Sequence, residues 1–174
     1  GRMLRSKGVS KLLEIFRSKE IKGFAELHLF GDCDFGNSDS ISNRSLSESS
    51  GKTVFFHGFV KDISQRIIDY DAYISLSWGE GIPFSVLEAC NAGLKVVLSD
   101  VAGHSEFFGY EGVDVCPEST GEAIAFILKY CSSFGSLSEF QVEARRVELN
   151  RRFGSEAVKN QIEGRVFSEL VADI

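Results

Sequence analysis

Residues 77–90 (SWGEGIPFSVLEAC) hold the residue types best suited to bind a charged ligand. They follow an apolar, β-rich run, turn through two glycines ending at Gly81, and continue as a helix that we expect to open with Pro83 at its first position. The free N–H groups of a first helical turn, here those of Phe84 and Ser85, combine with the helix dipole to attract a phosphate. Glycine lets a ligand approach the backbone closely. The stretch therefore predicts a phosphate cradle.

Two carboxylates in the same stretch suit hydroxyl groups better than phosphates. Seven residues separate Glu80 from Glu88, which places Glu80 in the loop and Glu88 in the second turn of the helix. A carboxylate is a good bidentate acceptor for the paired hydroxyls of a sugar or a ribose. The alternative is structural, with Glu80 capping the helix and Glu88 solvated at the surface. Spacing alone favours the structural alternative for Glu88 and does not decide for Glu80.

Residues 1–8 (GRMLRSKG) place two cations, Arg2 and Lys7, where we expect another helix to open. The helix dipole disfavours cations at this end, and a bound anion would resolve the conflict. The alternative is a pair of solvated charges, which the pattern taken alone favours. The two residues are therefore candidates whose weight depends on the rest of the chain.

Residues 55–60 (FFHGFV) form an aromatic strand that ends at the same expected edge. The backbone from Gly58 through Phe59 to Val60 could contact a flat base there. A strand that is simply packed in the core is the alternative.

The segments that must position these motifs alternate between strand-like and helix-like patterns. Short, β-rich apolar runs predict strands at residues 25–31, 53–58, 72–77, 95–99 and 113–116. The first amphipathic helix carries an apolar stripe of Val9, Leu12, Leu13 and Phe16. Further helices are expected from Asp62, Pro83, Ser119 (with capping-box spacing to Glu122) and about Leu137, the last broken near Gly154. Residues 34–52, rich in Ser, Asn, Asp and Gly, predict a mobile loop or a weak helix.

This alternation predicts parallel strands joined by right-handed crossovers. The expected fold is α/β, a Rossmann-like parallel sheet flanked by helices. Ligands bind such sheets at the carboxyl ends of the strands, which is where the motifs fall.

Length and composition describe one domain spanning residues 1–174, with 43% hydrophobic residues and a net charge of −6. The negative charge argues against binding to nucleic acid or to anionic lipid. Apolar runs are too short for a membrane span, and no secretory signal is visible. The four cysteines form no CxxC pair, and for the two that lie in apolar segments we expect buried free thiols, which fits a reducing, cytoplasmic setting. The start at Gly1 indicates a piece of a longer protein.

The motifs in this order resemble the C-terminal, nucleotide-sugar-binding domain of the retaining GT-B glycosyltransferases of family 4 (glycosyl transferases group 1). The resemblance covers nearly the whole chain. It rests on GRxxxxKG, a strand ending in Gly31, FHGFV, the two glutamates, residues 92–97 (AGLKVV), and Gly103 with Glu106. It implies the C-terminal half of a GT-B fold, with the acceptor-binding N-terminal domain absent from this chain.

The resemblance also implies a role for each motif. Arg2 and Lys7 would hold the diphosphate of the donor, Glu88 would accept the ribose hydroxyls, and Glu80 would contact the donor sugar as the catalytic-site residue. The remaining donor-binding positions implied in this way are Gly58, Phe59 and Val60 near the base and Gly81, Ile82, Phe84 and Ser85 at the phosphates.

These enzymes are typically metal-independent, since cations and a helix N-terminus stabilise the leaving diphosphate. We therefore expect no metal and no cofactor besides the nucleoside diphosphate sugar, which is a substrate. Asp32-Cys33-Asp34 superficially matches a metal-binding DxD motif, but it is expected to belong to the loop after the first strand.

The function implied is donor binding in a transferase that passes a sugar to a glycan or lipid-linked acceptor. Bacterial polysaccharide and lipopolysaccharide assembly is a common setting, with the whole enzyme in the cytoplasm or peripheral at the inner face of the membrane. This domain itself would make no direct membrane contact. Its partners would be the nucleotide-sugar donor and the missing N-terminal domain, and alone it would be inactive.

Two alternatives remain open. A GT-B-fold sugar-nucleotide epimerase would need further acid–base groups near the sugar. His28 and His57 fall inside expected strands, which favours packing, while His104 falls in a loop at the functional edge, where a ligand contact is the less favoured interpretation. A nonenzymatic α/β interaction domain would need neither the cations nor the glutamates.

Overall fold

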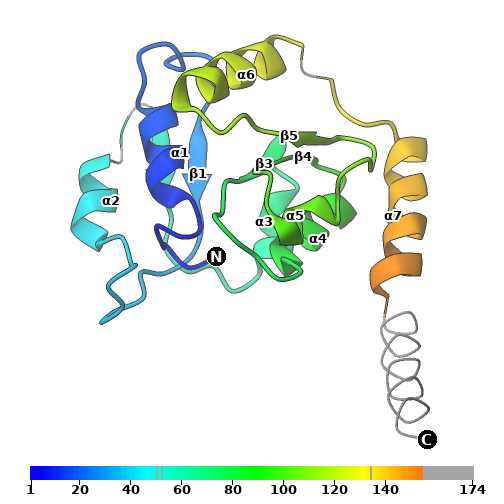
Figure 1. Ribbon diagram of the computed structural model, residues 1–174, viewed down its shortest axis with the longest axis horizontal. Coiled ribbons are helices and arrows are strands. Elements are labelled where there is room, and N and C mark those ends of the chain that lie inside the picture. The colour runs from blue at the N-terminus through cyan, green and yellow to red at the C-terminus, as the bar shows by residue number, and fades with distance from the viewer. Residues whose placement is uncertain (50, 52, 134, 155–174) are drawn as a thin grey trace, which may run out of the picture.

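The strands of the computed structural model form two parallel sheets, each flanked by helices (Figure 1). The structure describes residues 1–49, 51, 53–133 and 135–154. One sheet pairs β1 (Leu27–Leu29) with β2 (Val54–Phe56), and the other has the order β3 (Ala72–Ser75), β4 (Lys95–Leu98), β5 (Val113–Val115). All five predicted strands are present, each shorter than expected, and every pair is parallel.

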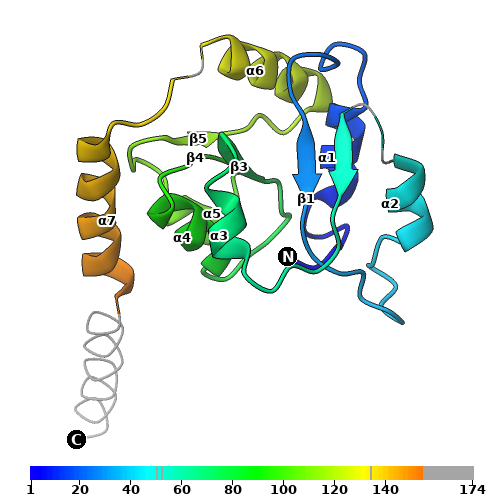
Figure 2. The same ribbon diagram turned by 180° about the vertical axis from the view of Figure 1, so that it is seen from behind.

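One continuous parallel sheet was expected. In the described residues the strands form two sheets instead, because no strand pairing joins β1 to β3. The turn before the first helix lies against the carboxyl end of β3 instead: the N–H of Trp78 donates to the carbonyl of Ser6 at 2.9 Å. Figure 2 shows the two-stranded sheet beside the three-stranded one, with its strands running in the same direction.

The helices begin close to the predicted positions. α1 (Val9–Phe16) buries its predicted apolar stripe, and α6 (Thr120–Ser132) is capped by Ser119, which accepts a hydrogen bond from the N–H of Glu122. Asp62 is the N-cap of α3 (Ile63–Ile67) but makes no side-chain capping bond. The other helices are α2 (Asn43–Ser49), α4 (Phe84–Asn91), α5 (Ala102–Ser105) and α7 (Glu139–Phe153).

The remaining helix boundaries agree with the prediction only in part. α4 begins at Phe84 with Pro83 as its N-cap, one residue later than expected. Residues 43–49 of the Ser-rich segment are helical, as the weak-helix alternative predicted, whereas the four-residue α5 lies where a loop was expected. α7 ends at Phe153 next to the expected break, and the helix expected beyond it lies outside the described residues.

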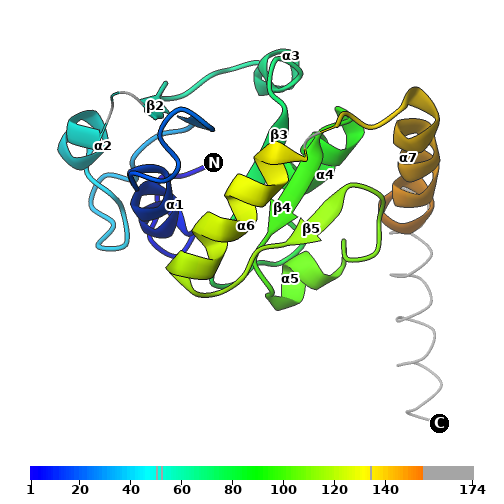
Figure 3. The same ribbon diagram turned by 90° about the horizontal axis from the view of Figure 1, so that it is seen from above.

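Strand β4 separates two apolar cores because its side chains alternate between the faces of the sheet. Val96 and Leu98 pack with residues of α4 and with Leu149 of α7, whereas Val97 packs in the core that α1 and α6 share. Figures 1 and 3 agree that α7 lies at the opposite end of the molecule from α2.

Helix α7 is fixed to α4 by a buried arginine. Arg145 is 2% exposed and donates to the carbonyls of Cys90 at 2.7 Å, Leu94 at 2.9 Å and Glu111 at 3.0 Å. Two of these carbonyls lie at or just beyond the C-terminus of α4, where the helix dipole favours a cation.

Candidate functional site

Three segments distant in sequence meet at the carboxyl ends of the strands. The N–H of Gly31, after β1, donates to the carbonyl of Gly58, after β2, at 2.7 Å. The Gly1 amino group donates to the carbonyl of Phe30 at 2.7 Å, which lays the N-terminal segment across the same ends (Figure 1). The predicted motifs at residues 1–8 and 55–60 are therefore neighbours.

Gly8 brings the N-terminal turn against the end of β3. Its φ of 74° suits glycine, and a Cβ at this position would overlap the carbonyl oxygen of Leu76. This close approach is what places Lys7 beside the loop that carries Glu80.

Lys7 and Glu80 form an ion pair, with 2.5 Å between Nζ and Oε2. The other carboxylate oxygen accepts a hydrogen bond from the hydroxyl of Ser77 at 2.7 Å. Burial raises the pKa of the Glu80 carboxyl, but the hydrogen bonds from Lys7 and Ser77 outweigh it and hold the pKa below its usual value. Glu80 is thus ionised at neutral pH, and it does not cap α4, which has no side-chain cap.

The first turn of α4 offers unused donors beside this pair. Val86 and Leu87 donate their N–H groups to the carbonyl of Pro83, at 3.0 Å and 3.4 Å. The N–H groups of Phe84 and Ser85 have no acceptor within the part of the chain that the structure describes. The predicted stretch therefore forms a helix N-terminus with free donors and no acidic residue in its first turn, while phosphate binding there stays a prediction.

The loop that leads into α4 is supported from behind by α5. A Cβ at Gly103 would overlap the backbone of both Glu80 and Gly81. On the solvent side, the side chains of Ile82 and Phe84 are exposed. The loop is therefore fixed on its inner side and open on its outer side.

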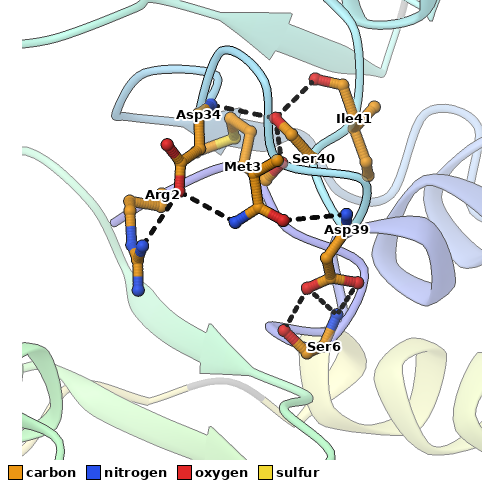
Figure 4. Close-up of polar contacts among 8 residues, drawn as sticks. Arg2, Met3, Ser6, Asp34, Asp39, Ser40 and Ile41 are labelled. Atoms are coloured by element: carbon orange, nitrogen blue, oxygen red, sulfur yellow. Dashed lines mark hydrogen bonds and ion pairs between the residues drawn. The ribbon is translucent and has the colours of Figure 1, made fainter.

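Arg2 pairs with a residue of another loop, and one expectation about it is wrong. α1 begins only at Val9, after a turn, so Arg2 is not at a helix start. Its guanidinium donates to Asp34 at 2.9 Å, as Figure 4 shows, and Asn37 donates to the same oxygen at 2.9 Å. The hydrogen bonds from Asn37 and Arg2 hold the pKa of the Asp34 carboxyl below its usual value. As expected, Asp34 belongs to the loop after β1.

Glu88 lies in the second turn of α4, as predicted, and its side chain is exposed. Burial lowers the pKa of the Gly1 amino group, an effect that the charge of Glu88 opposes and that of Lys7 reinforces. The N-terminal segment and Lys7 are anchored at the carboxyl ends of the strands, and Glu88 lies on the helix that begins there.

The segment expected near the base follows β2 directly. Gly58 has a φ of 69°, Phe59 is 70% exposed, and Val60 is half-buried. His28 lies in β1, as predicted, and packs on Phe55 with ring centroids 4.8 Å apart.

His57 is exposed one residue beyond β2 rather than inside it. Its ring stacks on Phe30 at 4.5 Å between centroids, and its Nε2 lies 2.9 Å from Nδ1 of His28. The packing expected of both histidines is therefore found, although His57 is not part of the strand.

His104 is wholly buried in α5, not in a loop. Its Nδ1 donates to the carbonyl of Ser99 at 3.1 Å, and its Nε2 has no partner among the described residues. Burial lowers the pKa of the imidazole more than the Ser99 carbonyl and the charge of Glu80 raise it. The sequence placed His104 at this edge but did not indicate its burial, and it did not single out the serines beneath Glu80, for which the only signal is the spacing Ser75-x-Ser77 at a strand end.

These features define the class of the molecule: a Rossmann-like α/β domain whose carboxyl edge carries free N–H donors, a lysine and a carboxylate. The family model of the glycosyl transferases group 1 matches residues 1–132, and the chain belongs to this family. In a search of curated proteins, no sequence matches the chain.

The chain is also similar in structure to solved glycosyltransferases of the GT-B fold. HepE of Anabaena, solved with UDP-glucose, aligns with a TM-score of 0.74 and 22% identity over 97% of this chain and 47% of its own. TarM aligns with a TM-score of 0.72 and 20% sequence identity, over 94% of this chain and 33% of TarM. WaaG, a glycosyltransferase involved in lipopolysaccharide biosynthesis, aligns with a TM-score of 0.67 and 18% sequence identity, over 90% of this chain and 42% of WaaG. The chain thus spans less than half the length of each of these proteins.

The described part of the chain contains neither a membrane-spanning helix nor a metal-binding cluster. No helix in that part of the chain is long and apolar enough to cross a membrane. No group of three or more His, Cys, Asp or Glu side chains there is arranged to hold a metal ion. All four cysteines are free, and Cys90 and Cys116 are buried as expected.

Proposed function

We propose that this chain is the donor-binding, C-terminal domain of a retaining, metal-independent family 4 glycosyltransferase whose donor is a nucleoside diphosphate sugar. The observation that carries the proposal is the free N-terminus of α4 beside the Lys7–Glu80 pair. A donor of this kind has a diphosphate for the first site and sugar hydroxyls for the second. The family match and the UDP-glucose in the structure of HepE support the choice of ligand.

The diphosphate would bind to the N–H groups of Phe84 and Ser85 and to Lys7. As the bond between sugar and phosphate breaks, negative charge grows on the leaving diphosphate, and prepositioned donors and cations stabilise it without reorganisation. Arg2 would add a second cation after leaving Asp34. This chain would therefore supply charge stabilisation from its own residues, without a metal.

The two glutamates would recognise hydroxyl groups. Glu80 would accept from the donor sugar and Glu88 from the ribose, since a carboxylate binds paired hydroxyls well. The backbone of residues 58–60 would lie near the base. The retaining outcome rests on the family resemblance.

The acceptor would be a glycan or a lipid-linked acceptor on the cytoplasmic side of a membrane, bound mainly by a separate N-terminal domain. Transfer requires donor and acceptor to be held together, so we expect this chain alone to transfer no sugar. An epimerase would need additional exposed acid–base groups near Glu80, and the nearby His104 is wholly buried. An interaction domain would not bind a diphosphate.

The test is calorimetric titration of this chain with UDP, GDP and ADP in excess chelator. We expect one of them to bind without a metal, and Lys7→Ala to weaken that binding. Lys11→Ala is the matched control, because Lys11 donates to the carbonyl of Glu118 in a different region. Strict dependence on Mg²⁺ or Mn²⁺ would refute the metal-free mechanism, and binding of none of the three would refute donor binding.

A further inference from the structure

We propose that Ser77 is a positioning residue for the donor sugar: its buried hydroxyl, fixed through Ser99 and His104, keeps the carboxylate of Glu80 aimed at the sugar site. This inference rests on the proposed function and deepens it, because it assigns residues that do not themselves touch the donor.

Ser77 contacts Glu80 directly. Ser77 is 1% exposed, and its hydroxyl donates to Oε1 of Glu80 at 2.7 Å. A hydroxyl has one proton to give, so the direction of this bond follows from the ionised carboxylate. The hydroxyl of Ser75, also buried, lies 3.3 Å from that of Ser77 and completes its surroundings.

Ser77 is held in place by Ser99, which is itself held by His104. Its carbonyl accepts a hydrogen bond from the hydroxyl of Ser99 at 2.6 Å. Ser99 is tied to β3 by its N–H, which donates to the carbonyl of Ser75 at 3.0 Å, and its own carbonyl accepts from Nδ1 of His104 at 3.1 Å. The network therefore links β3, the end of β4 and α5 under the loop that carries Glu80.

The free energy of folding gives a reason to assign this network a role in ligand binding. Buried hydroxyls and imidazoles cost free energy unless they are hydrogen-bonded, and an apolar core would avoid that cost. Here one polar atom, Nε2 of His104, is buried without a partner in the described part of the chain. Stability alone does not account for such a network, whereas orientation of a ligand-binding carboxylate does.

Lys7 and Ser77, the two partners of Glu80, would respond differently to donor binding. Lys7 must move toward the diphosphate when the donor binds, so its bond to Glu80 weakens at the moment when Glu80 is needed. Ser77 has no such competing partner. It keeps the carboxylate ordered, so little side-chain entropy is lost when the sugar arrives.

The experiment compares wild type with Ser77→Ala, using UDP and UDP-glucose as probes, or the corresponding GDP or ADP pair if wild type prefers that base. We expect the affinity for the diphosphate to stay within about twofold, and that for the sugar nucleotide to fall roughly threefold to tenfold, as for loss of one hydrogen bond. Ser77→Thr keeps a hydroxyl and should restore part of the loss. Ser105→Ala is the control, because Ser105 donates to the carbonyl of Ala102 and does not touch Glu80.

A second measurement needs no ligand. Removing a donor to the ionised carboxylate should raise the pKa of Glu80 in Ser77→Ala, as followed by carboxyl carbon NMR. An unchanged pKa of Glu80, or equal losses for both probes, would overturn the positioning role. Failure of every diphosphate to bind wild type would instead refute the proposed function, while the NMR titration would still decide whether Ser77 controls Glu80.

Discussion

Replacing Glu80 by Gln should change the affinities for diphosphate and for sugar nucleotide in opposite directions. In the ligand-free chain, Glu80 holds Lys7 at 2.5 Å, with 37% of the lysine side chain and 11% of the glutamate side chain exposed. A diphosphate must therefore take Lys7 from a carboxylate. Glutamine keeps the shape and the acceptor for Ser77 but loses the charge, and so it releases Lys7.

The partial exposure sets the magnitude. Solvent screens such a pair, so we assign it about 1 kcal/mol, near the upper limit for accessible ion pairs. Its release should raise the affinity for the diphosphate about fivefold. The sugar nucleotide gains the same term but loses a charged acceptor worth about 1.5–3 kcal/mol, so its affinity should fall about twofold to thirtyfold overall.

The assay is a titration of each variant with both probes at low and at high salt. Salt should shrink the gain for the diphosphate, because it screens the exposed part of the ion pair. Glu88→Gln is the comparison variant: it should weaken both probes about tenfold or more, since both carry the ribose. If Glu80→Gln shifts both probes by the same factor, Glu80 does not contact the sugar. If it leaves the diphosphate affinity unchanged at low salt, the competition for Lys7 does not exist.

The remaining predictions concern stability. Arg145→Met should lower the free energy of unfolding by about 3 kcal/mol in chemical denaturation, because it leaves three carbonyls without their donor. Arg146→Met should cost under about 1 kcal/mol, because the partly exposed Arg146 donates to a single backbone carbonyl, that of Asn91. Burial lowers the pKa of His104 below its ordinary 6.5, so the unfolded chain binds this proton more tightly. Melting temperature should therefore fall as pH drops below about 6.5, and His104→Gln should flatten that dependence. Gly8→Ala should destabilise the fold by about 2 kcal/mol or more and weaken diphosphate binding, because the φ of Gly8 is 74° and a Cβ there would overlap Leu76. Gly121→Ala in α6 is the control: nothing lies within 4 Å of a Cβ at that position, so the change should be neutral or stabilising.

Local features of the fold were predictable because their signals are local. The five strands are short β-rich runs with breaks on both sides, and the Ser119 cap is set by residues three apart. The four-residue α5 could not be predicted, because it makes little more than one helical turn and an amphipathic pattern has to repeat over several turns to be recognised. The extent of α2 was left open for a related reason, since a Ser-rich sequence has weak helix propensity and little apolar periodicity.

The contacts of the candidate site could not be predicted, because they join distant residues. Sequence spacing singled out Lys7 and Glu80 separately, but the pair is 73 positions apart, and Arg2 is 32 positions from Asp34. Nothing near either cation in sequence indicates its partner. The buried position of His104 was missed for the same reason: its burial follows from the packing of α5 against the loop at Glu80, which no neighbouring residue encodes.

Under the proposed function, these pairings give the donor site an order of events. Both candidate cations are neutralised in the ligand-free chain, Arg2 by Asp34 and Lys7 by Glu80. The N–H groups at the start of α4 are the donors that need no rearrangement, so a diphosphate would bind there first. Its charge would then draw Lys7 away from Glu80, and the carboxylate, still held by Ser77, would become available to the sugar. Recognition of the sugar would thus depend on prior binding of the diphosphate, and a free sugar would have to break the ion pair without compensation.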